Sequence, residues 1–143
     1  MIELMVVVAL AALLLGIAVP SFTGFIANQR SKTAAADFSM SAVFARSEAI
    51  KRNADVTITA VSAGADGWKG GWTVDSGGTQ LSIQSAYSGL TFSGPSSAIT
   101  YKNTGRLSAA VTSLSISGPD SSAVRCVSFN LSGLPKSRLG ACS

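Results

Sequence analysis

The sequence contains no histidine, which removes the side chain that most often serves as a general base or a metal ligand. Charged residues make up only 13% of its 143 residues, and cysteine occurs twice. There is no GxSxG elbow, P-loop, HExxH motif or CxxC pair. We therefore expect no catalytic residues, no cofactor and no metal site, and we do not expect an enzyme.

What the sequence does contain is a long apolar stretch at its N-terminus. No ionisable side chain occurs from Leu4 to Ile26. As a helix this stretch would be about 35 Å long, enough to cross a bilayer core of about 30 Å. Glu3 lies at its edge, and two interpretations of this residue stay open. It is either a solvated acid favoured by the helix dipole, or a charge that needs a partner once the helix is buried.

The chain as a whole is predicted to fold as α+β, with a long N-terminal helix, of which the apolar stretch is the first half, packed on an antiparallel β-sheet domain. The helix is predicted over residues 4–53, and small residues and one phenylalanine form a stripe along its second half: Ala34, Phe38, Ala42, Ala45 and Ala49. After Asn53 the period changes to two, which predicts short strands over 55–61, 68–75, 80–84, 89–92, 98–101, 111–117 and 123–131. Trp68 and Trp72 fit either a core and rim role or an aromatic binding platform.

Several segments carry a resemblance to a known family. Ile2-Glu-Leu-Met-Val-Val-Val-Ala-Leu10, followed by Ala18-Val-Pro-Ser-Phe22, resembles the N-terminal helix of type IV pilins and type II secretion pseudopilins. Phe44-Ala-Arg-Ser-Glu-Ala-Ile-Lys-Arg-Asn53 resembles the GspH/FimT group of minor pilins and pseudopilins, and residues 68–75 and 99–107 resemble two of its strand motifs. The resemblance implies a transmembrane and assembly half of the helix over residues 1–27. It implies a periplasmic globular domain over residues 28–143, with helix to residue 53 and a β-region over 54–143.

The resemblance also implies a function. A protein of this group is a single-pass protein of the bacterial inner membrane that assembles into, and primes or caps, a type IV pilus or a type II secretion pseudopilus. Its partners are other pilins or pseudopilins in a helical filament, the inner membrane, and the prepilin peptidase that acts on the full-length precursor. In these families the carboxylate that matches Glu3 pairs with the N-terminal amine of a neighbouring subunit.

The first residues depart from the family pattern. In these families the peptidase cuts after a glycine and methylates the new N-terminal residue, and the mature protein begins Phe-Thr-Leu-Ile-Glu. Ile2 and Glu3 match the last two of those residues, so Met1 stands where the leucine would be. Our hypothesis is a start codon assigned too late. We therefore expect the genomic DNA upstream to encode an in-frame Gly-Phe-Thr.

Both cysteines lie in the last 18 residues of the sequence. In a domain held outside the inner membrane, Cys126 and Cys142 are predicted to form a disulfide, and the alternative is two unrelated buried thiols. The bond would close a loop of about 15 residues, which is worth about 3 kcal/mol in the chain-entropy argument.

The C-terminal segment is the best candidate for recognition of a ligand. After Asp120 it carries Arg125, Lys136 and Arg138 and no acid, and residues 133–140 are predicted to form a loop. Such cations could neutralise DNA phosphates without reading bases. Some FimT-type proteins bind DNA in natural transformation through a C-terminal Gly-Arg-x-Arg. Gly133-Leu-Pro-Lys-Ser-Arg138 resembles it with longer spacing and one lysine. The alternative is a solvated loop, or one that contacts the next subunit.

Overall fold

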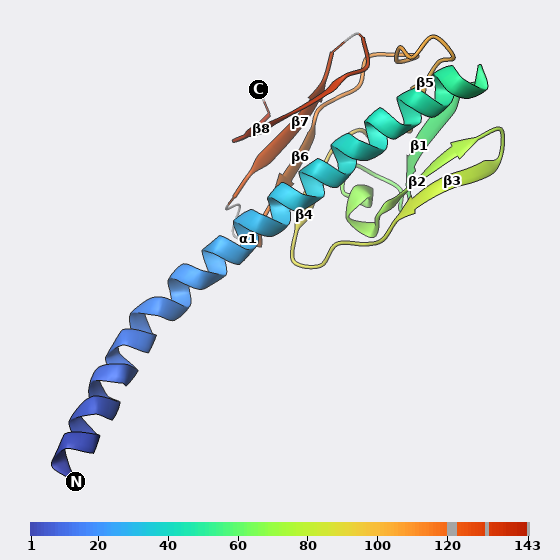
Figure 1. The fold of residues 1–143 in the computed structure, drawn as a ribbon. Helices are drawn as coiled ribbons and strands as arrows, with labels where there is room; N and C mark the ends of the chain where they lie inside the picture. The colour runs from blue at the N-terminus through green and yellow to red at the C-terminus, as the bar shows by residue number, and fades with distance from the viewer. Residues whose placement is uncertain (120–122, 131, 143) are drawn as a thin grey trace.

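The computed structural model describes residues 1–119, 123–130 and 132–142, without the side chains of residues 15–23. One helix, α1, runs from Ile2 to Arg52, which confirms the single long helix predicted from the sequence. It ends at Asn53, which adopts a left-handed conformation with φ of 50° and donates its backbone N–H to the carbonyls of Ala49 and Ile50. Figure 1 shows that the C-terminal half of α1 lies across the β-domain, whereas its N-terminal half projects beyond the domain.

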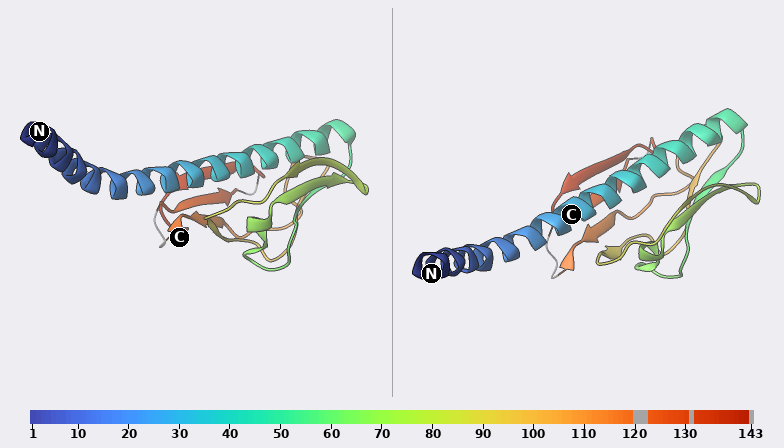
Figure 2. Two further views of the ribbon diagram at one scale, coloured as in Figure 1. Left: turned by 90° about the horizontal axis from the view of Figure 1, so that it is seen from below. Right: turned by 60° about the horizontal axis from the view of Figure 1, so that its bottom comes forward.

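The β-region forms two sheets rather than the one expected. The strands are β1 (Val56–Ala60), β2 (Trp72–Ser76), β3 (Thr79–Gln84), β4 (Thr91–Ser93), β5 (Ile99–Tyr101), β6 (Leu114–Ser117), β7 (Arg125–Phe129) and β8 (Pro135–Leu139). Their order is β3-β2-β1-β5 in one sheet and β4-β6-β7-β8 in the other, and neighbouring strands pair antiparallel. Both sheets lie on the same side of α1 (Figure 2).

Two segments differ from their predicted structure. The strand predicted over 68–75 is divided into a 3₁₀ turn, η1 (Gly67–Gly70), and β2. Gly71 joins them with φ of 92°, and an added Cβ there would lie 2.1 Å from the carbonyl oxygen of Gln84, so the chain needs glycine at this point. The segment predicted as a C-terminal loop contains β8, an edge strand that pairs with β7. Leu131, the predicted end of the preceding strand, lies outside the described residues.

The core confirms the predicted stripe on α1. Ala34, Phe38, Ala42, Ala45 and Ala49 are all fully buried, and α1 contacts strands of both sheets. The small alanine side chains let the strands approach the helix closely.

Phe38 lies at the centre of an aromatic cluster. Its ring makes edge-to-face contacts with Trp68, Trp72 and Phe129 at centroid distances of 5.2, 5.1 and 6.0 Å. Both tryptophans are buried, and their indole N–H groups donate to the Pro95 carbonyl and the Ser41 hydroxyl. The tryptophans are therefore core residues, and the aromatic binding platform is wrong.

The apolar stretch predicted over residues 4–26 includes residues 15–23, whose side chains lie outside the described residues. Among the residues that the structure describes, no helix is long and apolar enough to cross a membrane.

Candidate assembly and binding surfaces

The projecting half of α1 covers residues 2–26, and its described side chains, those of residues 2–14 and 24–26, are exposed and mostly apolar. Glu3 lies in its first turn, where the helix dipole favours a carboxylate. The described side chains around Glu3 are exposed and apolar, and over residues 2–14 the large ones are Ile2, Leu4, Met5, Val6, Val7, Val8, Leu10, Leu13 and Leu14. An exposed apolar surface of this extent marks a place where another apolar surface binds, either of a protein or of a membrane.

A second apolar surface lies where α1 runs beside β8, and we call it the α1–β8 seam. It is a shallow groove of about 460 Å³ lined by Ser39, Met40, Val43, Phe44 and Pro135. Met40 is 68% exposed, although it is one of the larger apolar side chains of the domain. This surface was not predicted from the sequence. The signal was present, because residues 40, 43 and 44 have the i, i+3, i+4 spacing of a helix face.

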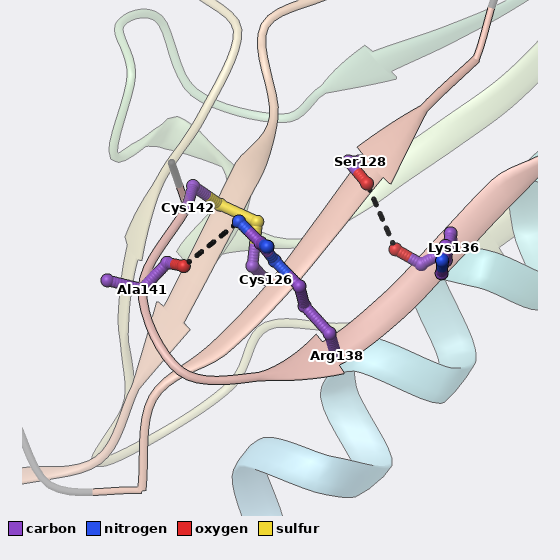
Figure 3. Close-up of a disulfide and its surroundings, with 6 residues drawn as sticks. All are labelled: Cys126, Ser128, Lys136, Arg138, Ala141 and Cys142. Atoms are coloured by element: carbon purple, nitrogen blue, oxygen red, sulfur yellow. Dashed lines mark hydrogen bonds between the residues drawn. A yellow bond between two sulfur atoms is a disulfide. The ribbon is translucent and has the colours of Figure 1, made fainter.

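The two cysteines form a disulfide. Cys126 lies on β7 and is fully buried, and its Cα atom is 5.2 Å from that of Cys142. The bond fastens the last residues of the chain to β7, as Figure 3 shows. The alternative of two unrelated buried thiols does not hold in this structure.

Lys136 and Arg138 lie on β8 and share one face of the sheet. In the register of β7 and β8, Lys136 is opposite Ser128 and Arg138 is opposite Cys126. The Arg138 guanidinium Nη2 donates a hydrogen bond of 3.3 Å to the Ala141 carbonyl, beside the disulfide (Figure 3). The two cations therefore sit on an edge strand and not on a loop as predicted.

Arg125 does not join Lys136 and Arg138. Successive residues of a strand point to opposite faces, so Arg125 lies on the opposite face of β7 from Cys126. Its Nη2 donates a 3.1 Å hydrogen bond to Oδ1 of Asn28 on α1, and its Nε is buried. Arg125 thus ties β7 to the helix, and the three cations do not form one surface.

The ionisable groups with shifted pKa values make packing and hydrogen-bond contacts within the domain. Burial raises the pKa of Tyr101 to about 12, and its hydroxyl donates a 2.7 Å hydrogen bond to the Gly133 carbonyl. Burial, together with the hydrogen bond to Asp37, raises the pKa of Tyr87 well above its usual value. The hydrogen bond from Arg52 lowers the pKa of Glu48.

The arrangement of a long N-terminal helix on antiparallel sheets, with half of the helix projecting, defines a pilin-like fold. Two crystal structures of the type IV minor pilin FimU from Pseudomonas aeruginosa share this fold. One has a TM-score of 0.60 and 21% identity, and the match covers 77% of this chain and 92% of that chain. The second crystal form has a TM-score of 0.62 and 20% identity, and the match covers 82% of this chain and 92% of that chain.

The family is identified by a match of the sequence to a family model. Residues 34–133 match the model of the family described as type II transport protein GspH. The chain therefore belongs to the GspH family of pilin-like proteins. No curated protein matches it significantly.

Proposed function

We propose that this chain is a minor subunit that assembles with other pilins or pseudopilins into the filament of a type IV pilus or a type II secretion pseudopilus, and that it primes or caps that filament. The observation that carries the proposal is the projecting half of α1. Over residues 2–14 its large apolar side chains are exposed, and a partner surface that buries them stabilises association by about 25 cal/mol per Å². Other apolar helices of the same kind supply that surface.

Before assembly, the projecting half is anchored in the inner membrane, with the globular domain in the periplasm. The full-length precursor is a substrate of the prepilin peptidase. On assembly the lipid contacts of the helix are exchanged for helix contacts. Glu3 is then surrounded by apolar side chains, where an unpaired charge costs several kcal/mol. The N-terminal amine of a neighbouring subunit removes that cost by pairing with Glu3.

The α1–β8 seam supplies a second contact. Met40, Val43 and Phe44 extend the apolar surface of α1 into the globular domain, and Pro135 closes the groove from β8. A neighbouring subunit seated on the projecting half of α1 therefore also meets the domain at the seam.

The proposal is tested by shearing surface filaments from cells that produce the chain and from cells that lack its gene. The chain should sediment with the filaments at a low ratio to the major subunit. Loss of the gene should reduce the number of filaments without changing the level of the major subunit. A normal filament number, with the chain confined to the membrane fraction, would contradict the proposal.

A second candidate function is DNA binding during DNA uptake. The observation that favours it is that Lys136 and Arg138 lie side by side on an exposed strand whose following residues are fastened by the disulfide. Arg125, the third predicted cation, lies on the opposite face and contacts Asn28. Two cations bind phosphates only weakly, so DNA binding requires further basic residues.

A further inference from the structure

A polar pocket lies on α1 just beyond its apolar half, and we call it the base pocket. It has a volume of about 320 Å³ and lies between residues 29–33 of α1 and residues 86–90 of the loop that joins β3 to β4. Its lining includes Gln29, Arg30 and Thr33 from α1 and Ala86, Tyr87 and Ser88 from the loop. Figure 1 shows this loop at the end of the domain from which the projecting half of α1 leaves.

The loop side of the base pocket is fixed on the core. The Tyr87 ring contacts the rings of Trp72 and Phe92 at centroid distances of 5.8 and 5.5 Å. Its hydroxyl donates a 2.7 Å hydrogen bond to Asp37, and its backbone N–H donates a 2.9 Å hydrogen bond to the Lys69 carbonyl. Because this wall is already ordered, a ligand that enters the pocket does not have to immobilise it.

Arg30 gives the base pocket a positive charge. The residue is exposed, and its Nη1 lies 3.5 Å from the position that a Cβ atom would take on Gly89, so the guanidinium lies against the loop. It forms no ion pair with any carboxylate in the part of the chain that the structure describes. The next acid along α1 is Asp37, about 10 Å further along the helix axis, and it accepts the hydrogen bond from the Tyr87 hydroxyl. The guanidinium is therefore open to an anion.

Neutral hydrogen-bonding groups lie around this charge, and apolar side chains lie directly before it on the helix. The amide of Gln29 and the hydroxyls of Thr33 and Ser88 line the pocket, and all three residues are exposed. Phe25 and Ile26, at the end of the apolar half, are 65% and 37% exposed. Residues 26 and 29 are only about 4.5 Å apart along the helix axis. A ligand that satisfies both surfaces has an anionic, hydroxyl-bearing head and a long apolar tail.

We propose that the base pocket binds the headgroup of an anionic phospholipid, of which phosphatidylglycerol has the chemistry that fits it. The Arg30 guanidinium pairs with the phosphodiester, and the hydroxyl and amide groups of the pocket bond to the glycerol headgroup. The acyl chains run along the projecting half of α1. The inference rests on the membrane anchoring proposed above, and it adds a lipid that holds the domain against the bilayer until the helix moves into the filament.

Three ligands distinguish an anionic lipid from other sources of phosphate. The full chain in a non-ionic detergent is titrated with phosphatidylglycerol, and native mass spectrometry counts the lipid molecules bound to each chain. The same titration is made with phosphatidylcholine, whose choline cancels the phosphate charge, and inorganic phosphate is added as a competitor. We expect one phosphatidylglycerol to bind at saturation, about tenfold more tightly than phosphatidylcholine, and inorganic phosphate at equal concentration not to displace it.

Lys32 supplies a matched control for Arg30. It is exposed, carries the same charge and lies two residues further along α1, which places it about 200° around the helix at nearly the same height above the apolar half. Arg30→Gln should weaken phosphatidylglycerol binding about tenfold, whereas Lys32→Gln should leave it within about twofold of the wild type. A third variant, Thr33→Phe, keeps the charge but fills the pocket with a ring, and it should also lose the lipid.

Equal weakening by Arg30→Gln and Lys32→Gln would show a response to charge near the membrane alone and would overturn the proposal. Binding that does not saturate at one lipid would do the same. Full displacement by inorganic phosphate would identify an ion site that does not use the apolar tail, and retained binding in Thr33→Phe would place the lipid elsewhere. Filament shearing tests the subunit function separately, because Arg30→Gln leaves Glu3 and the projecting half of α1 intact.

Discussion

Removal of the disulfide between Cys126 and Cys142 should destabilise the domain by an amount that the structure allows us to work out. The perturbation is Cys126→Ala with Cys142→Ala. The bond joins residues that are 16 apart in sequence. Without it the unfolded chain gains the entropy of a loop of this size, which corresponds to about 3 kcal/mol. Because a domain of this size shifts its Tm by about 3 to 5 °C per kcal/mol, the Tm should fall by about 10 °C.

The assay is thermal and urea unfolding of the full chain in detergent, followed by the β-sheet signal in circular dichroism. The wild type is measured oxidised and reduced. If loop entropy dominates, the reduced wild type and the double variant should melt within about 2 °C of each other, and both should show a larger m-value than the oxidised protein. A small extra loss in the variant reports the packing of the buried Cys126 sulfur.

The result that would refute this reasoning is a Tm that falls by less than about 3 °C on reduction, with an unchanged m-value. That outcome would mean that β7 and β8 hold the C-terminal residues without the covalent bond. It would also mean that the disulfide is not needed to hold Arg138 beside Ala141.

Three further predictions follow from the core, the buried tyrosine and the seam. Phe38→Ala removes the ring at the centre of the aromatic cluster and should lower the free energy of unfolding, measured in urea, by about 3 to 5 kcal/mol. The control variant Met40→Ala, at the exposed seam, should lower it far less. The pKa of Tyr101 is about 12 in the folded chain and about 10 in the unfolded chain. Its contribution to the free energy of unfolding is therefore fully present below pH 10 and should be lost as the pH rises from 10 to 12. Tyr101→Phe should weaken this pH dependence. Val43→Asp should leave the melting temperature unchanged but reduce incorporation into sheared filaments, and equal incorporation would exclude the seam as a subunit contact.

The parts of the fold that the sequence predicts are those where burial forces a pattern. The stripe that contains Phe38 and Ala42 is visible because residues on one helix face recur every three or four positions. β1 alternates buried and more exposed residues, so its period of two is also visible. The helix end at Asn53 follows from a residue that tolerates the left-handed conformation.

β8 could not be predicted because an edge strand has little need of apolar side chains. Pro135 at its start and exposed cations along it are typical of a loop, yet both are also tolerated on an edge strand, where they hinder pairing with another chain. The separation of Arg125 from Lys136 depends on which face each residue occupies. That information lies in the register of β7 and β8, and spacing along the sequence does not contain it.

The central claim, that the chain functions as a filament subunit through the projecting half of α1, is tested most directly at Glu3. Glu3→Ala is compared with the wild type for two quantities in the same cells: the amount of chain in the membrane fraction and the amount in sheared filaments. Our account predicts a normal membrane fraction and a filament fraction reduced at least tenfold, the loss expected when a pairing interaction of about 1.4 kcal/mol or more is removed. Normal incorporation of Glu3→Ala into filaments would contradict it.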